Sequence, residues 1–129
     1  MHINTIRIRY SDDTCLIDFN HIQDSLKCDS EVLEDIFAEW NHGSGRESSR
    51  FLDENVRSLS VGDYVSVDGL WYRCEGIGWK EKTKDEVNKW FDTMLSIRSK
   101  RNAGKTSSDE RLARWGDKRM AERLLGIEA

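Results

Sequence analysis

The fold of this chain is decided by the stretch Tyr64-Val65-Ser66-Val67-Asp68-Gly69-Leu70-Trp71-Tyr72-Arg73-Cys74. Asp68-Gly69 is a dipeptide favoured by the two-residue type I′ turn of a β-hairpin, and the residues on either side of it alternate in character. The turn predicts that Val67 lies opposite Leu70 and that Val65 lies opposite Tyr72. One face of the hairpin should then meet a hydrophobic core. Its members are Val65, Val67, Leu70, Tyr72 and Cys74.

The opposite face of this hairpin carries an unusual set of side chains for a surface in water. Its members are Tyr64, Ser66, Trp71, Arg73 and Glu75. Tryptophan, tyrosine and arginine are enriched where proteins bind one another. Two interpretations remain open: this face binds a partner, or the C-terminal helices of the same chain cover it.

A second hairpin is predicted before the first. Thr5 to Tyr10 alternates between apolar and basic residues, and the alternation resumes at Cys15, Ile17 and Phe19 after a polar turn. A helix should follow, with Ser30 as its N-cap. Its apolar face is expected to consist of Val32, Leu33, Ile36, Phe37 and Trp40. Residues 42–50 are rich in Gly and Ser and predict an exposed, mobile loop.

Two further helices are expected in the C-terminal third. Thr83-Lys84-Asp85-Glu86 has the spacing of a capping box and should open an amphipathic helix. A second such box, Ser107-Ser108-Asp109-Glu110, should open the last helix. The apolar stripe of that helix is narrow, so it could dock on the domain, on a partner, or on a second copy of the chain. The stripe consists of Leu112, Trp115, Met120 and Leu124.

The predicted fold class is α+β. It has a small antiparallel sheet of two β-hairpins and about three α-helices on one face of the sheet, in the order β-β-α-β-β-α-α. We expect a compact α+β domain over residues 1–98 and a basic connector over 99–107. The charged helix over 108–129 would belong to the same domain or serve as an arm for a dimer or a partner.

Charge is distributed unevenly along the chain. The net charge is −4 overall, but residues 10–54 carry −9 and residues 96–123 carry +5. Such an asymmetry suggests either internal complementarity or two partner surfaces. The sequence has no apolar run long enough to cross a bilayer and no signal peptide, so we expect a cytoplasmic protein.

Residues that could carry out chemistry do not form a recognisable motif. The three cysteines, Cys15, Cys28 and Cys74, make neither an even set nor a Cys-x-x-Cys pair, which favours small buried thiols. The histidines have no neighbours at metal-ligand spacing. Cys28 with His21 could form a catalytic pair, but no motif surrounds either residue. We therefore expect no enzymatic activity, no metal and no cofactor.

Two segments resemble a known family. They are Leu33-Glu34-Asp35-Ile36-Phe37-Ala38-Glu39-Trp40-Asn41 and Arg57-Ser58-Leu59-Ser60-Val61-Gly62-Asp63-Tyr64-Val65 followed by Tyr72-Arg73-Cys74. Together they resemble the YodL-like group of small proteins carried by phages, plasmids and conjugative elements. The resemblance covers roughly residues 30–80. It implies a mobile-element origin, a bacterial host cell and a fold without established catalysis.

The function expected from these observations is non-enzymatic. The chain would bind and block a host defence protein or ribonucleoprotein, in the manner of an anti-CRISPR protein, with its acidic segment imitating nucleic acid. The expected partner-binding residues are Tyr64, Trp71, Arg73, Glu75, Glu34, Asp35 and Glu39.

The alternative is a nucleic-acid-binding module. In that case Tyr64, Trp71 and Arg73 would stack on bases, and the basic C-terminal segment would follow the phosphates. The basic residues expected to do so are Arg98, Lys100, Arg101, Lys105, Arg114 and Lys118. Either a monomer or a homodimer is compatible with the sequence, and an enzyme acting on a nucleotide or a protein side chain is the least favoured class.

Overall fold

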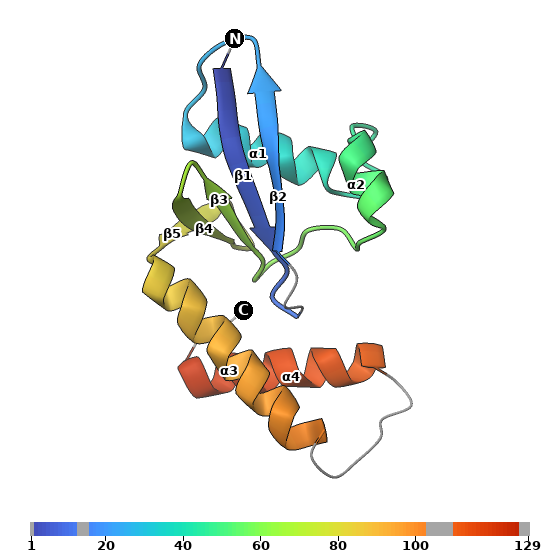
Figure 1. The fold of residues 1–129 in the computed structure, drawn as a ribbon, viewed down its shortest axis with the longest axis vertical. Helices are drawn as coiled ribbons and strands as arrows, with labels where there is room; N and C mark the ends of the chain where they lie inside the picture. Colours follow the sequence, from blue (N-terminus) through green and yellow to red (C-terminus); the bar gives the residue numbers. More distant parts are fainter. Residues whose placement is uncertain (1, 13–15, 103–109, 127–129) are drawn as a thin grey trace.

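The computed structural model describes residues 2–12, 16–102 and 110–126, and for residues 100–102 and 110–116 it describes the backbone alone. Strands and helices follow one another in the order β-β-α-α-β-β-β-α-α (Figure 1). The strands are β1 His2–Arg9, β2 Leu16–Gln23, β3 Tyr64–Val67, β4 Leu70–Cys74 and β5 Trp79–Lys82. The helices are α1 Asp29–Glu39, α2 Ser49–Glu54, α3 Lys84–Asn102 and α4 Glu110–Leu125.

The α+β class is confirmed, while the element order differs from the expected one by an extra helix, α2, and an extra strand, β5. The five strands form one antiparallel sheet in the order β2-β1-β3-β4-β5. Among the described residues, no helix is both long enough and apolar enough to span a membrane.

The central hairpin has the predicted register. Val67 pairs with Leu70 and Val65 pairs with Tyr72. Asp68 and Gly69 both have positive φ values, 50° and 91°, as a type I′ turn requires. The predicted core face is correct for Val65, which is fully buried, but wrong for Leu70, which is 52% exposed because it lies at the tip of the hairpin.

The first hairpin is also confirmed, because β1 pairs with β2 along its whole length, from His2 opposite Gln23 to Arg9 opposite Leu16. Strand β1 then pairs with β3 and joins the two hairpins into one sheet. Ile6 and Ile8 are fully buried on the same face as Val65. Cys15 lies outside the described residues.

Helix α1 and its C-cap Trp40 bury most of the predicted stripe, with Val32, Leu33, Ile36 and Trp40 at 1% exposure or less. Phe37 is only partly buried. The expected N-cap is wrong by two residues: the helix begins at Asp29, and Cys28 is the N-cap.

The polar stretch after α1 contains a short helix that the sequence pattern did not reveal. Ser48 caps α2 by accepting a hydrogen bond from the Phe51 backbone nitrogen at 3.2 Å. Phe51 is fully buried, and its ring centroid lies 5.4 Å from that of Trp40. The loop predicted over 42–50 therefore passes into a helix at Ser49, because one aromatic residue anchors it to the core.

The capping box of α3 is confirmed. The Thr83 hydroxyl accepts a hydrogen bond from the Glu86 backbone nitrogen at 3.1 Å. In return, the Glu86 carboxylate accepts a hydrogen bond from the Thr83 backbone nitrogen at 3.0 Å. Helix α3 runs on to Asn102, so residues 99–102, which were expected in the connector, are helical. Most of the second predicted box, residues 107–109, lies outside the described residues.

Helix α4 packs against α3 (Figure 1). The side of α4 that packs differs from the predicted stripe: Ala121 is fully buried and Leu125 is partly buried, whereas Met120 is 50% and Leu124 66% exposed. The side chains of Leu112 and Trp115 are outside the described part of the chain.

The sheet separates two hydrophobic cores. On one face α1 and α2 cover β1, β3 and β4, and on the other face α3 and α4 cover β3 and β4. The expectation that all helices lie on one face is therefore wrong. Alternation in a strand sends side chains to both faces, and here both sets are apolar enough to require cover.

Candidate partner-binding site

The expected binding face of the central hairpin is not a surface. Tyr64, Trp71 and Arg73 are 2%, 8% and 2% exposed, because α3 lies over them. The Tyr64 ring packs against Trp90 and Phe91 of α3, with centroid separations of 6.5 and 5.8 Å. The prediction that these three residues bind a partner or stack on bases is wrong, and the alternative of cover by the C-terminal helices is confirmed.

Arg73 is instead a buried structural cation. Its Nη1 donates to the Glu75 carboxylate at 2.6 Å, while Nε and Nη2 have no hydrogen-bond partner. Burial raises the pKa of the nearby Tyr64 hydroxyl to about 12, although the charge of Arg73 acts in the opposite direction.

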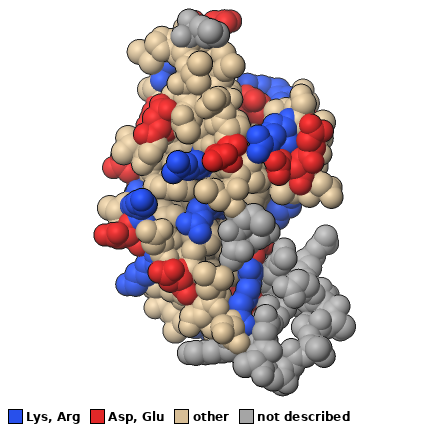
Figure 2. All heavy atoms as spheres, viewed as in Figure 1, with Lys and Arg blue, Asp and Glu red and all other residues tan. Residues whose placement is uncertain are grey.

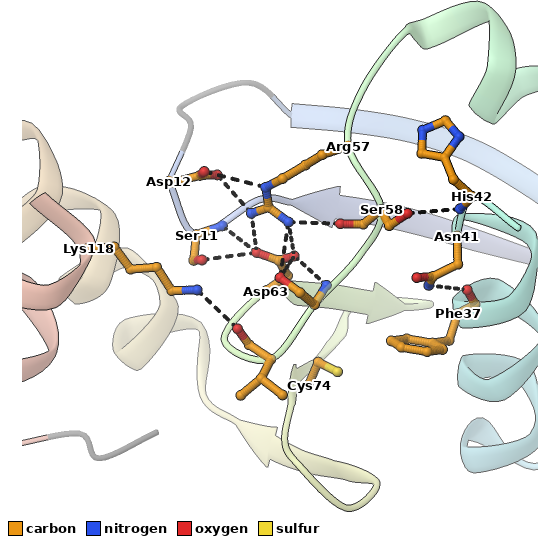
Figure 3. A network of polar contacts seen from close by, with 12 residues as sticks. Ser11, Asp12, Phe37, Asn41, His42, Arg57, Ser58, Asp63, Cys74 and Lys118 are labelled. Atoms are coloured by element: carbon orange, nitrogen blue, oxygen red, sulfur yellow. Dashed lines mark hydrogen bonds and ion pairs between the residues drawn. The ribbon is translucent and has the colours of Figure 1, made fainter. Parts of the chain in front are cut away.

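The stretch from Arg57 to Asp63 forms a partly buried network of polar contacts (Figure 3). The Asp63 carboxylate is fully buried and accepts hydrogen bonds from both Arg57 Nη atoms, at 2.7 and 2.9 Å. It also accepts from the backbone nitrogens of Ser11 and Ser60, each at 2.8 Å. Arg57 Nη2 reaches Asp12 at 2.8 Å. Because donors surround Asp63, this carboxylate holds the turn before β3 in place and is not available as a general base.

The same network fixes two of the basic residues expected to contact nucleic acid. Arg98 pairs with Asp117 at 3.3 Å and donates to the Asp12 carbonyl. Lys118 donates to the Val61 carbonyl at 3.1 Å (Figure 3). Both side chains make contacts within the protein, which argues against their assignment to phosphate binding. The side chains of Lys100, Arg101, Lys105 and Arg114 lie outside the described residues.

Figure 2 shows how charged side chains are distributed over one face of the molecule. Among the described residues of that face, lysines and arginines alternate with aspartates and glutamates rather than forming a continuous basic track. Proteins that bind the nucleic-acid backbone carry a continuous basic track on their surface.

The acidic residues of α1 divide between its two flanks. Asp35 and Glu39 lie towards β2, where each carboxylate is 3.9 Å from a ring nitrogen of His21. Asp35 also pairs with Lys27 at 2.7 Å and Arg46 at 3.3 Å. The charge of Asp35 is thus largely neutralised within the protein, which makes it a poor anchor for a partner.

Glu34 lies on the other flank of α1 and contributes to a cavity of about 210 Å³. The cavity is formed between α1, the end of β4 and the start of β5. Its lining residues are Glu34, Phe37, Cys74, Glu75, Gly76, Gly78 and Trp79. Glu34 and Glu75 are the two predicted partner-binding residues that line this cavity.

Two aromatic side chains form walls of this cavity. The rings of Phe37 and Trp79 meet at 82° with their centroids 6.3 Å apart. The turn that places Trp79 is closed by a hydrogen bond from the Glu75 nitrogen to the Gly78 carbonyl at 3.0 Å, and Gly78 has a φ of 71°. Phe37 was expected only as core, and Trp79 was not assigned to a strand. The Gly-Ile-Gly-Trp sequence of residues 76–79 was the available signal for a turn into β5.

The chemistry of the cavity favours binding over catalysis. Burial raises the pKa of the Cys74 thiol to about 11, and the carboxylates of Asp63 and Glu75 act in the same direction. The thiol is therefore neutral near pH 7 and a weak nucleophile. His21 and His42 lie elsewhere, the latter against Phe51 at 4.4 Å. In the described residues no group of three or more His, Cys, Asp or Glu side chains could hold a metal ion.

A second cavity, of about 250 Å³, lies between the tip of the central hairpin and the start of α3. Acidic and basic side chains line it together, and two of them, Lys82 and Glu86, are 3.5 Å apart. Its charges are balanced, so it offers less selectivity than the cavity beside Glu34.

Comparison with known proteins adds no relative: no family model, no curated protein and no solved structure matches this chain. The resemblance to the YodL-like group remains a prediction.

Proposed function

We propose that this protein acts by binding another protein, without catalysing a reaction, and that the Glu34 flank of α1 with its adjoining cavity is the docking surface. One observation carries the proposal: Glu34 and Glu75 lie beside Phe37 and Trp79 around a single cavity. Aromatic residues with a polar rim are typical of protein interfaces. The partner should be basic, because Glu34 is an exposed carboxylate with no ion pair among the described residues.

Within this proposal, the partner is a host defence protein or ribonucleoprotein of a bacterial cell. The net charge of −9 over residues 10–54 supports it, since a surface of that sign is attracted to the Arg- and Lys-lined channels in which such machinery holds nucleic acid. The predicted resemblance to mobile-element proteins agrees with the same role, which would be inhibition by occupying the channel.

Charge reversal at Glu34 tests the docking surface. In a capture experiment with bacterial lysate, the Glu34→Lys variant should retain about a tenth or less of the partner held by the wild type. The matched control is Glu81→Lys, which reverses an exposed charge on β5 outside the cavity and should capture as the wild type does. Equal capture by all three proteins would contradict the proposed surface.

A cellular assay tests the inhibitory role. Expression of the chain in a bacterium with active CRISPR immunity should restore plaque formation by a targeted phage, and Glu34→Lys should not. Unchanged immunity in cells that hold the folded wild-type protein would contradict inhibition of this defence system.

A further inference from the structure

The cavity beside Glu34 has the composition of a receptor for a cation. Two nearly perpendicular aromatic rings form its walls, and the faces of aromatic rings attract cations electrostatically. Both ionisable side chains at its rim, Glu34 and Glu75, are acidic. Its size is also informative. At about 210 Å³ it is smaller than the 300–1,000 Å³ or so that small-molecule sites occupy, which suits the end of one side chain.

The charges around the cavity do not contribute equally. Arg73 neutralises Glu75 through their 2.6 Å contact from the opposite side of the sheet. The net negative charge at the opening therefore comes from Glu34. The Cys74 thiol is buried and uncharged and contributes a polarisable floor.

We infer that this cavity binds the cationic end of a lysine or arginine side chain of the partner. The inference rests on the proposed function and names the chemistry of its partner. The cation would lie against the Phe37 and Trp79 rings with Glu34 as its counter-ion. The aromatic walls would favour the aliphatic part of the same side chain, since lysine and arginine carry apolar stems below their charges.

Small probes test the cavity independently of any partner. Nα-acetyl-lysine methylamide and Nα-acetyl-arginine methylamide should each be titrated into the ¹⁵N-labelled full-length protein, with the amide signals of Gly76 and Gly78 as reporters. The neutral control is Nα-acetyl-norleucine methylamide, which has the lysine stem without the ammonium group. We expect saturable shifts with one or both cationic probes and at least about fivefold weaker binding of norleucine.

Two variants assign the binding to this cavity. Glu34→Gln, at an exposed position, should weaken binding of the cationic probe about two- to fivefold. Trp79→Leu keeps an apolar wall but removes the ring, and should weaken it about tenfold. Glu81→Gln removes an equal charge outside the cavity and should leave binding unchanged. Unfolding measurements on each variant separate lost binding from lost structure.

The outcomes are distinct. Equal binding of norleucine and the cationic probes, or no shift with any probe, would overturn the inference. If the probes fail while Glu34→Lys still abolishes partner capture, the docking surface stands without a cation receptor. If the probes bind as expected and Glu34→Lys captures normally, the cavity is a cation receptor and the proposed docking surface is wrong.

Discussion

At the scale of single residues, Asp63 accounts for the polar side chains that recur between Arg57 and Asp63. A fully buried carboxylate is costly unless it is paired and hydrogen-bonded. Asp63 meets both conditions through Arg57 and through the backbone nitrogens of Ser11 and Ser60. The network ties the end of β1 to the turn before β3, so the polar residues between Arg57 and Asp63 have a structural role.

Replacing Asp63 by Asn should therefore be strongly destabilising. The variant keeps the shape of the side chain but leaves Arg57 without its closest counter-ion, at a cost of about 3 kcal/mol in the free energy of unfolding. Urea denaturation measures this value. The control is Asp53→Asn, an exposed carboxylate on α2, which should change it little. Similar values for both variants would contradict the role of Asp63.

Stability should fall in acid in a way that depends on Asp12. Burial alone would raise its pKa, but the hydrogen bonds and charge of Arg57 hold the pKa below its ordinary value of about 4. Since the folded pKa is lower than the unfolded one, this contribution is complete above about pH 4 and is lost as the pH falls below it. Asp35, held by Lys27 and Arg46, has a lowered pKa and acts in the same direction.

Unfolding free energies measured by urea denaturation at successive pH values check this prediction. The decline as the pH falls below about 4 should be shallower in Asp12→Asn than in the wild type. An identical acid decline in both proteins would show that Asp12 is not linked to folding.

At the scale of elements, the central hairpin is the one whose conformation depends most directly on its own turn residues. Asp68 and Gly69 adopt the positive φ values of their turn, and Asp68 also accepts hydrogen bonds from Asn4 and from the Thr5 backbone nitrogen, at 2.7 and 2.8 Å. The turn thereby positions β3 and β4 and is held to β1. By contrast, α2 and β5 are short and depend on tertiary contacts, Phe51 for the first and pairing with β4 for the second.

Gly69 and Gly76 provide a matched test of the turn. A Cβ added to either glycine meets no atom within 4 Å, but only Gly69 has a positive φ. Gly69→Ala should destabilise the protein by about 1–2 kcal/mol through backbone strain alone, whereas Gly76→Ala should be neutral or slightly stabilising. Thermal or urea unfolding distinguishes them, and equal effects would argue against strain in the turn.

At the scale of the whole molecule, the sheet supports two cores, and this arrangement removes the surface expected from the sequence. Trp71 packs with Val87, Trp90 and Phe91 of α3. The Trp90 indole also donates to the Ser11 carbonyl at 2.9 Å, which links the second core to the Asp63 network. A hydrogen bond therefore connects the core under α3 to the polar network around Asp63.

Substitutions at two neighbouring residues of β4 test the hydrophobic core that α3 covers. Trp71→Ala should lower the free energy of unfolding by about 3–5 kcal/mol, because it empties a buried site. Leu70→Ala, one residue away and half-exposed, should cost much less. Far-UV circular dichroism during urea denaturation measures both values, and comparable losses would place Trp71 outside the core.

The sequence by itself determined the elements whose signals are local. The Asp68-Gly69 turn determined the register of β3 and β4, the spacing from Val32 to Trp40 determined the buried face of α1, and Thr83 with Glu86 determined where α3 begins. Each signal depends on residues a few positions apart, so elementary backbone and side-chain rules were sufficient.

Only the tertiary structure decided which surfaces are free. Alternation assigned Trp71 and Arg73 to one face of the hairpin, but an apolar face can be covered by the same chain or by another. The cavity could not be inferred either, because Glu34 and Phe37 on α1 meet Cys74, Glu75 and Trp79 only after the chain has folded back on itself. The physical reason is that burial and proximity depend on long-range packing, which no local pattern encodes.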